Sequence, residues 1–404
     1  MNEAPLAEWL ETAATFSLPG PGVSRYFLTD EHRRLLDWLN ELMQSCGLTV
    51  ELDHAGNLVG RKPSKQSEQT LYFGSHQDTV SQGGAYDGIL GILLPLAVLY
   101  ELREVELPFA VELIAFGDEE GTRFQSTLVG SSAVAGCFDQ ATLEFRDDQG
   151  VSVAEALRRF GLQPEKIPEL ARNKDKALGF IEVHIEQGPV LEKHDLPVGL
   201  VSAITGIERH QIHIQGMAGH AGTVPMAQRK DAMVAASRYV LWLDRYCRER
   251  EQIVGVIGKL EVVPNSVNVI PDHVLLTVEL RSPDTEKRLD ARAAMQALDK
   301  ELSVQGFTIN RELTYSREGV QCDAALAGRL QQAIEAEEIP VLSLFSGAGH
   351  DGLAMTYLCP VAMLFVRCKD GLSHHPDEAI DMHDALVAKR IIKTLLLQPE
   401  PFYG

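Results

Sequence analysis

The chain has 404 residues, of which 45% are hydrophobic and 23% are charged, and this length and composition indicate a globular protein of two or three domains. Its 37 basic and 57 acidic residues give a formal net charge of −20 without any cluster of lysine and arginine, which argues against nucleic acid or an anionic membrane as a partner. The six cysteines form no Cys-x-x-Cys pair and the acidic N-terminal segment lacks the pattern of a secretory signal, so we expect a cytoplasmic protein without disulfides.

The first part of the chain alternates helical and strand patterns. The apolar run in the 89–100 region is interrupted by Gly91 and Pro95 and is too short to cross a bilayer. In chain order, the expected elements are helices over 5–17 and 30–47, strands over 48–52, 57–60 and 71–73, a helix over 89–102 and a strand over 110–116. This alternation predicts an α/β fold with a mostly parallel sheet, covered by helices on both faces, and with functional residues at the carboxyl ends of its strands.

The character of the chain changes near Gly206, after a mixed region over 122–178 and a strand over 179–188. The elements expected next are strands over 209–215, 253–262, 274–279 and 307–314 and helices over 231–251 and 285–305. The first pattern then resumes, with a helix over 324–337, a strand over 361–366 and a helix over 385–397. We therefore predict a discontinuous catalytic domain of residues 1–206 and 318–404, with a smaller α/β domain of two βαβ-like halves inserted at 207–317.

The segment Gly74–Gly91, GSHQDTVSQGGAYDGILG, carries the first candidate site. His76 follows an apolar strand and can bind a metal through one ring nitrogen, with Asp78 close enough to set its tautomer and orientation. Asp87 lies where a helix is expected to begin, and its two carboxylate oxygens can bridge two cations. The alternative is an exposed histidine at a strand end and a helix-capping aspartate, which is common in α/β proteins. The other strand ends favour the metal site.

Histidines and carboxylates also follow the other strands of the main domain. Three imidazoles and several carboxylates, without a thiolate, suit divalent cations such as Zn²⁺ or Mn²⁺, and the same ligands accept Co²⁺ or Ni²⁺. One bridging aspartate and two further ligands per cation leave room for water and substrate. A hydroxide shared by the two cations would be the nucleophile. We assign His76, Asp87 and His184 to one cation, and Asp87, Glu120 and His374 to the other.

Glu119 and Glu120 directly follow the strand over 110–116. If the backbone is extended there, their side chains point in different directions. One can then bind a cation while the other acts as the general base on the attacking water and passes the proton to the leaving nitrogen. The alternative is a surface cluster of charges, but the position directly after a buried-looking strand favours the catalytic interpretation.

These residues resemble the dinuclear metal amidohydrolases, a family that includes aminoacylases, glutamate carboxypeptidases, allantoate amidohydrolases and N-carbamoyl-L-amino acid hydrolases. The resemblance covers nearly the whole chain. In that family the matching residues bind the metals, and the first glutamate of the pair, here Glu119, is the base. The resemblance rests on His76-x-Asp78, Asp87-Gly88, Glu119-Glu120-Gly121 and Ser373-His374 before Pro376.

His184 narrows the resemblance to one branch. Peptidase members carry an acidic ligand where this chain has His184, in HIEQGPVLE. Together with GMAGHAGTVPM and SGAGHDG, this motif resembles the branch that acts on ureido (N-carbamoyl) acids. It implies cleavage of a C–N bond of allantoate or an N-carbamoyl-L-amino acid, with release of ammonia and carbon dioxide. The alternatives are an aminoacylase or dipeptidase of the same family, and a catalytically silent binding protein, against which the complete ligand set argues.

The resemblance also implies that the inserted domain is a lid and dimerisation module. His220, in GMAGHAGTVP, matches a histidine that reaches the active site of the partner subunit and stabilises the developing oxyanion there. Without the resemblance, a single histidine between glycines is more often an ordinary loop residue. Asn268 and Arg281 match residues that hold the substrate carboxylate, for which the arginine fork is suited. A surface ion pair is the alternative for Arg281. Gln187 and His350 match further substrate-pocket positions.

The sequence thus predicts a homodimeric metallohydrolase with two divalent cations per subunit and a small ureido-acid substrate. His375, next to the assigned ligand His374, is not expected to bind a cation. The other histidines are expected to be solvated or structural: His32, His54, His194, His210, His213, His273 and His383.

Overall fold

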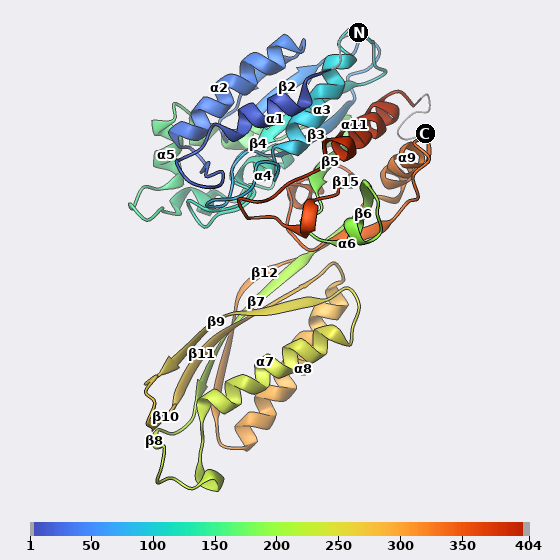
Figure 1. The fold of residues 1–404 in the computed structure, drawn as a ribbon. Helices are drawn as coiled ribbons and strands as arrows, with labels where there is room; N and C mark the ends of the chain where they lie inside the picture. The colour runs from blue at the N-terminus through green and yellow to red at the C-terminus, as the bar shows by residue number, and fades with distance from the viewer. Residues whose placement is uncertain (1–3, 399–404) are drawn as a thin grey trace. The chain divides into compact units, whose positions relative to one another are not determined.

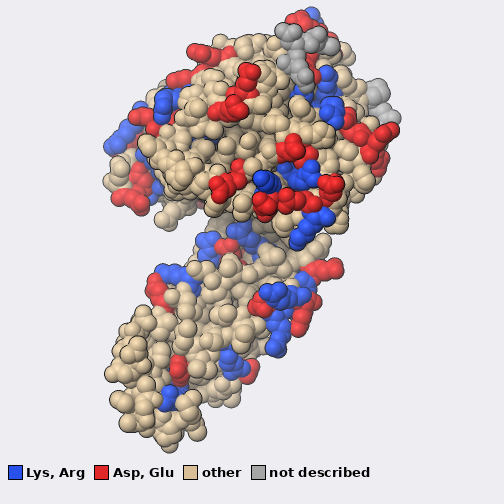
Figure 2. Space-filling model, viewed as in Figure 1, with Lys and Arg blue, Asp and Glu red and all other residues tan. Residues whose placement is uncertain are grey.

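The computed structural model describes residues 4–398, which divide into two compact units (Figure 1). Unit 1 comprises the described residues up to Ser202, Cys322–Leu344 and the described residues from His350 onward. Unit 2 comprises Ala203–Gln321 and the short segment Phe345–Gly349. Nothing in the sequence pointed to Phe345–Gly349 as part of unit 2, because that segment lies between two expected elements of the main domain. On the viewed face, lysine and arginine are interspersed with aspartate and glutamate (Figure 2).

The helices and strands follow each other in the alternating order that the sequence indicated. In chain order they are α1 (Leu6–Ala14), α2 (Asp30–Ser45), β1 (Thr49–Leu52), β2 (Leu58–Lys62), β3 (Thr70–His76), α3 (Leu90–Glu101), β4 (Ala110–Phe116), α4 (Val129–Ala135), α5 (Val153–Arg159), β5 (Ala177–Ile185), α6 (Val190–Lys193), β6 (Val198–Ile204), β7 (Gly206–Gln215), β8 (Gly219–His220), α7 (Ala232–Arg248), β9 (Val254–Val263), β10 (Val269–Ile270), β11 (His273–Ser282), α8 (Thr285–Val304), β12 (Thr308–Arg317), β13 (Val320–Gln321), α9 (Ala324–Glu335), β14 (Ser343–Ser346), α10 (Gly352–Met355), β15 (Val361–Val366) and α11 (Met382–Leu396). The sequence missed β6, β13 and β14, which join one end of the larger sheet, and the two-residue strands β8 and β10.

The larger sheet has the strand order β1-β2-β4-β3-β5-β15-β6-β13, with β14 beside β6. Its central strands β4, β3, β5 and β15 run parallel, whereas the strands on either side pair antiparallel. The predicted α/β class, with a parallel centre and a smaller inserted α/β unit, is confirmed. Because the central strands are parallel, the carboxyl ends of β3, β4, β5 and β15 lie at one edge of the sheet.

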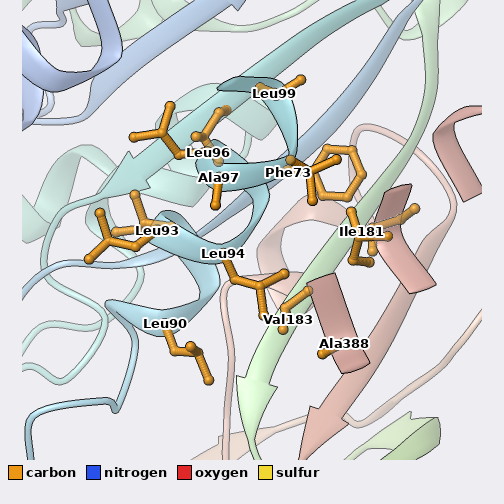
Figure 3. Packing of buried hydrophobic residues seen from close by; sticks show 14 of the residues in the cluster. Phe73, Leu90, Leu93, Leu94, Leu96, Ala97, Leu99, Ile181, Val183 and Ala388 are labelled. Carbon is orange, nitrogen blue, oxygen red and sulfur yellow. The ribbon is translucent and has the colours of Figure 1, made fainter. Parts of the chain in front are cut away.

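Helix α3 forms the centre of the unit 1 core (Figure 3). It is apolar on all sides, and every residue from Leu90 to Leu99 is buried, because β3 and β5 cover it on one side and α1 and α11 on the other. Each fully buried leucine contributes about 2 kcal/mol to folding. The helix is thereby fixed against the sheet, and so is the loop before it, which carries Asp87. No helix within residues 4–398 is long and apolar enough to cross a membrane.

The alternation of side chains along the central strands separates the core from the site. Phe73 of β3 and Ile181 and Val183 of β5 point into the cluster around α3 (Figure 3). His76 and His184, which lie an odd number of positions away from them, therefore face the opposite side of the sheet. On that side α4 and α10 pack against the strands and against each other.

Unit 2 is an antiparallel sheet, ordered β12-β7-β11-β9, with α7 and α8 on one face (Figure 1). Strand β11 lies between β7 and β9, and β7 lies between β11 and β12, so the two predicted βαβ-like halves are interleaved rather than side by side. Buried and half-exposed residues alternate along β11, as expected for a sheet with one covered face. Within the described part of the chain, β9 pairs only with β11 and so forms an edge.

One of the histidines expected to be structural, His32, is completely buried and predicts an acid-sensitive fold. Its Nδ1 accepts a hydrogen bond from the Leu28 amide at 2.9 Å, and its ring stacks on Phe160 at 5.4 Å. Burial lowers the pKa of His32 to about 3, from an ordinary value of 6.5. The unfolded chain therefore binds a proton between pH 6.5 and 3 that the folded chain excludes, and stability falls in that range by about 1.4 kcal/mol per pH unit.

The His32→Gln variant keeps an acceptor for the Leu28 amide but has no group that titrates there. Its free energy of unfolding is expected to be lower than that of the parent at pH 8 and to depend less on pH between 6.5 and 4. Urea denaturation of both proteins at pH 8 and between pH 6.5 and 4 measures their free energies of unfolding and how steeply each depends on pH. Equal slopes for the parent and the variant would contradict the assignment of the acid sensitivity to His32.

Candidate metal centre

The ends of β3 and β5 bring two histidines to the same aspartate. His76 Nε2 lies 3.3 Å and His184 Nε2 lies 3.1 Å from Asp87 Oδ1, and the two nitrogens are 3.3 Å apart. All three side chains are buried, and Asp87 Oδ1 has no hydrogen-bond partner among the described residues. A buried carboxylate oxygen without a donor is rare in a folded protein and indicates a position built for a cation.

A second group of ligand atoms meets at the other oxygen of Asp87. His374 Nε2 lies 3.4 Å from Asp87 Oδ2 and 3.5 Å from Glu120 Oε1. The potential ligand atoms of Asp87, Glu120 and His374 all lie within 4.8 Å of one another, as do those of His76, Asp87 and His184. These are the two sets that the sequence analysis assigned to separate cations. Their role as ligands stays a prediction until metal binding is measured.

The chemistry of the donors fits the expected metals. Imidazole nitrogens and carboxylate oxygens without a thiolate suit Zn²⁺ or Mn²⁺. Burial raises the pKa of Glu120 to about 7, and a cation between these groups would offset the energy needed to keep so many carboxylates charged. The alternative role of Asp87 as a helix cap is not observed, because α3 begins at Leu90 and has no side-chain cap.

Main-chain carbonyls orient both buried histidines. Nδ1 of His76 lies 2.9 Å from the carbonyl oxygen of Asp78, and Nδ1 of His184 lies 2.9 Å from that of Ile185. A proton on each Nδ1 leaves the lone pair of each Nε2 for a cation. The contact from Asp78 to His76 is thus made by the main chain. The Asp78 carboxylate instead accepts hydrogen bonds at 3.1 Å from the amides of Glu119 and Glu120.

The acidic loop after β4 is bent, so the extended backbone that the sequence analysis took as the condition for diverging glutamates is not present. Asp118, directly before the pair, has a left-handed backbone with φ of 60°. Both Glu119 and Glu120 have oxygens within 4.8 Å of a ring nitrogen of His76 and of each other. Burial raises the pKa of Glu119 well above its usual range. The bend lets both carboxylates face one site.

A buried amide that the sequence analysis missed holds this loop. Asn57 Oδ1 accepts a hydrogen bond from the Gly117 amide, and Asn57 Nδ2 donates to Asp53 and to the carbonyl of Gly130. Asn57 therefore ties β2 to both ends of the segment that carries Glu119. Its position after an ordinary turn gave no functional signal in the sequence.

Gln187 and His350 both lie beside the candidate ligands. Gln187 has a left-handed backbone with φ of 57°, and its Nε2 donates to Asp87 Oδ2 at 2.8 Å. His350 is buried with its ring edge-on to that of His184 at 4.5 Å, and burial holds the pKa of His350 well below its usual range. A substrate role for either residue stays a prediction.

The remaining predicted residues belong to unit 2. His220 of β8 pairs with Val269 of β10, and the amide of Ala221 donates to the carbonyl of Asn268, so His220 and Asn268 are close neighbours. Arg281 lies at the far end of β11. Its Nε and one terminal nitrogen contact Glu279 Oε1 at 2.8 Å, and its other terminal nitrogen donates to the carbonyl of Gly347.

Two further residues lie behind Asp87. Ser373 Oγ is 2.7 Å from Asp87 Oδ2 and 2.9 Å from Glu378 Oε2. Glu378 Oε1 accepts the amides of Tyr86 and Asp87, both at 3.0 Å. The sequence analysis noted Ser373 only as part of a motif and missed Glu378. The position of Glu378, four residues after the candidate ligand His374, was the feature of the sequence that could have identified it.

Gly88 gives a sharp test of the geometry around His76. It has φ of 71°, and a Cβ at this position would lie 2.5 Å from the His76 ring. The Gly88→Ala variant is expected to displace this ring and to lose bound cation as well as stability, as measured by cation content and Tm. Gly150→Ala is the matched control, since Gly150 has φ of 78° with nothing within 4 Å of the added Cβ. It is expected to lose about 1 kcal/mol through backbone strain alone and to keep its cations.

Comparisons with known proteins agree on a single family. The model of Peptidase family M20/M25/M40 matches residues 72–398. The chain is 37% identical over 381 residues to an N-carbamoyl-L-amino acid amidohydrolase from Geobacillus stearothermophilus, which covers 93% of this chain and 92% of that protein. It is 36% identical over 402 residues to an allantoate deiminase from Arabidopsis thaliana, which covers 89% of this chain and 75% of that protein.

A solved structure extends the similarity to three dimensions. The amidase of the hydantoinase/carbamoylase family from Burkholderia multivorans superposes with a TM-score of 0.91 at 29% identity, over 98% of this chain and 97% of that chain. The similarity therefore includes both units.

Proposed function

Because this chain belongs to Peptidase family M20/M25/M40, and to its hydantoinase/carbamoylase and allantoate deiminase branch, we propose that it hydrolyses the C–N bond of a ureido acid. Allantoate and N-carbamoyl-L-amino acids are the proposed substrates, and ammonia and carbon dioxide, by way of carbamate, are the proposed products. Aminoacylase or dipeptidase activity is the alternative within the family.

One observation carries the proposal: the two oxygens of Asp87 face two separate sets of ligand atoms at the carboxyl ends of parallel strands. His76 and His184 would complete the first set, and Glu120 and His374 the second. Two divalent cations held there would supply a nucleophilic water at neutral pH and polarise the substrate carbonyl. Every candidate ligand position carries a side chain that can bind a cation, which argues against a catalytically silent binding protein.

Glu119 is the proposed general base. Its carboxylate would take a proton from the attacking water and return it to the nitrogen that leaves. Asp78 would position it, since the Asp78 carboxylate accepts the amides of Glu119 and Glu120 and so fixes the bend that aims both side chains at the site.

Two residues of unit 2, Arg281 and Asn268, are proposed to bind the part of the substrate away from the reacting carbonyl, and His220 is proposed to stabilise the oxyanion that forms from that carbonyl. Arg281 has its guanidinium fixed by Glu279 and Gly347, and its remaining N–H groups suit a carboxylate. Asn268 would contact the same carboxylate. The His220 Nδ1 accepts a hydrogen bond from the Gly222 amide at 3.1 Å, so a neutral ring carries its proton on Nε2 and can donate it to an oxyanion.

The same geometry supports the proposed homodimer. The stretch of β11 from His273, beside the hairpin of His220, to Arg281 is about 27 Å long, which is far longer than any ureido acid. If both residues act on one substrate, His220 and Arg281 of a single chain are too far apart to do so, and a second copy would supply one of them. The edge strand β9 and helix α7 offer apolar side chains for such a contact: Val254, Val256, Leu260, Val234, Val240 and Leu241 are all exposed.

The test is ammonia release from allantoate, from N-carbamoyl α-amino acids, from carbamoyl-β-alanine and from ureidoglycolate, after chelation and reloading with Mn²⁺ or Zn²⁺. Release from at least one of them that requires the cation is expected. Cleavage of dipeptides or N-acetyl amino acids, with silence on every ureido acid, would favour the alternative. Cation binding without any turnover would favour a binding protein.

A further inference from the structure

Glu378 lies at the centre of a network that ends on Asp87. Its Oε1 accepts two main-chain amides, and its Oε2 faces the Ser373 hydroxyl at 2.9 Å. The side chain is 5% exposed, and a Cβ at Gly84 would lie 2.0 Å from its carboxyl carbon, so only glycine leaves room for it there. The loop before α3 is thus shaped around this carboxylate.

The Ser373 hydroxyl has two acceptors and one proton. It lies 2.7 Å from Asp87 Oδ2 and 2.9 Å from Glu378 Oε2, and it can donate to only one of them at a time. Asp87 Oδ2 also receives Nε2 of Gln187 at 2.8 Å. When both donors are engaged, the two lone-pair positions of this oxygen are filled, and none is left for a cation. Asp87 Oδ1 accepts no hydrogen bond.

We propose that Glu378 is a positioning residue that sets the affinity of the second cation, the one assigned to Asp87, Glu120 and His374. When Glu378 accepts the hydrogen bond from the Ser373 hydroxyl, a lone pair of Asp87 Oδ2 becomes free without any movement of heavy atoms. Gln187 Nε2, which lies 3.4 Å from Ser373 Oγ, gains that hydroxyl as an acceptor. The first cation would be held at Asp87 Oδ1, which takes no part in this network. The inference rests on the proposed two-cation centre.

The Glu378→Gln variant should reverse the network while keeping its shape. Its amide oxygen must still accept the amides of Tyr86 and Asp87, so its NH₂ group points at Ser373 and donates to it. Ser373 is then left with Asp87 Oδ2 as its acceptor, and that lone pair stays filled. The Ser373→Ala variant removes the competing proton altogether.

The experiment is calorimetric titration of the metal-free full-length protein with Mn²⁺, which reports two dissociation constants without any catalysis. Four proteins are compared: the parent, Glu378→Gln, Ser373→Ala and the double variant. Glu378→Gln is expected to weaken the second Mn²⁺ about 10-fold and to leave the first unchanged. Ser373→Ala should bind the second Mn²⁺ at least as tightly as the parent. The double variant should behave as Ser373→Ala does, because Glu378 acts through the hydroxyl.

The control is Glu101→Gln, which alters another buried carboxylate. Lys389 and Lys393 hold it at the last residue of α3, at the opposite end of the helix from the loop that carries Asp87. Both of its Mn²⁺ constants should match those of the parent. An unchanged second constant in Glu378→Gln, equal weakening of both constants, or a double variant as weak as Glu378→Gln would each overturn the inference. A parent that binds a single Mn²⁺ would overturn the two-cation centre itself, and the inference with it.

Discussion

The Glu119→Gln variant is expected to lose about 10³-fold in kcat on the proposed ureido substrate and to keep the cation content of the parent. Glutamine has nearly the shape of glutamate but cannot accept a proton from water at neutral pH. Proton transfer by a positioned base is worth 10²- to 10⁴-fold in rate, so the loss corresponds to about 4 kcal/mol of transition-state free energy. KM should change little, because the substituted group acts on the water and not on the substrate in the ground state.

The neighbouring residue provides the matched comparison. Glu120→Gln changes the same functional group one position along the same bent loop, but Glu120 is assigned to the second cation. It is expected to lower the cation content from two to one. Cation analysis together with steady-state kinetics separates the two roles. Full turnover in Glu119→Gln with two bound cations would show that another group takes the proton. Loss of a cation in Glu119→Gln would place Glu119 among the ligands.

The parts of the site that the sequence predicted share a simple physical origin. His76, Glu119, Glu120 and His184 each lie at or just after the end of an apolar strand, and parallel strands bring such ends to one edge of the sheet. Local pattern therefore sufficed to place them together. The same reasoning correctly predicted the α/β class and the smaller inserted unit.

The parts that it did not predict depend on contacts between residues far apart in the chain. Asn57 reaches Gly117 and Gly130, and Glu378 reaches the amides of Tyr86 and Asp87, and none of these partners is adjacent in sequence. The bend at Asp118 was also invisible, because a non-glycine residue with positive φ is uncommon and is imposed here by the surrounding hydrogen bonds. The sequence indicated the candidate ligand residues, whereas the supporting hydrogen bonds required the structure.

The Asp87→Asn variant is expected to lose both cations and at least 10³-fold in activity, because Asp87 is the only residue shared by the two assigned sets. An asparagine amide has a single uncharged oxygen and cannot bridge.

The cations should also stabilise the parent. A ligand present at 100 times its dissociation constant adds about 2.7 kcal/mol, which for a domain of this size raises Tm by roughly 5 to 10 °C. Chelation should therefore lower the Tm of the parent and leave that of Asp87→Asn unchanged.

Two adjacent histidines make the test residue-specific. His374 and His375 have side chains of nearly equal exposure, 49% and 52%, but only His374 faces Asp87 and Glu120. His374→Ala should retain one cation and part of the chelator-sensitive stability, whereas His375→Ala should retain two cations and the full response. Metal analysis and thermal unfolding, each with and without chelator, measure both. Equal losses in the two histidine variants would mean that removing either imidazole disturbs the loop as a whole. Two bound cations in Asp87→Asn would mean that the two sets of ligands do not share a bridging oxygen.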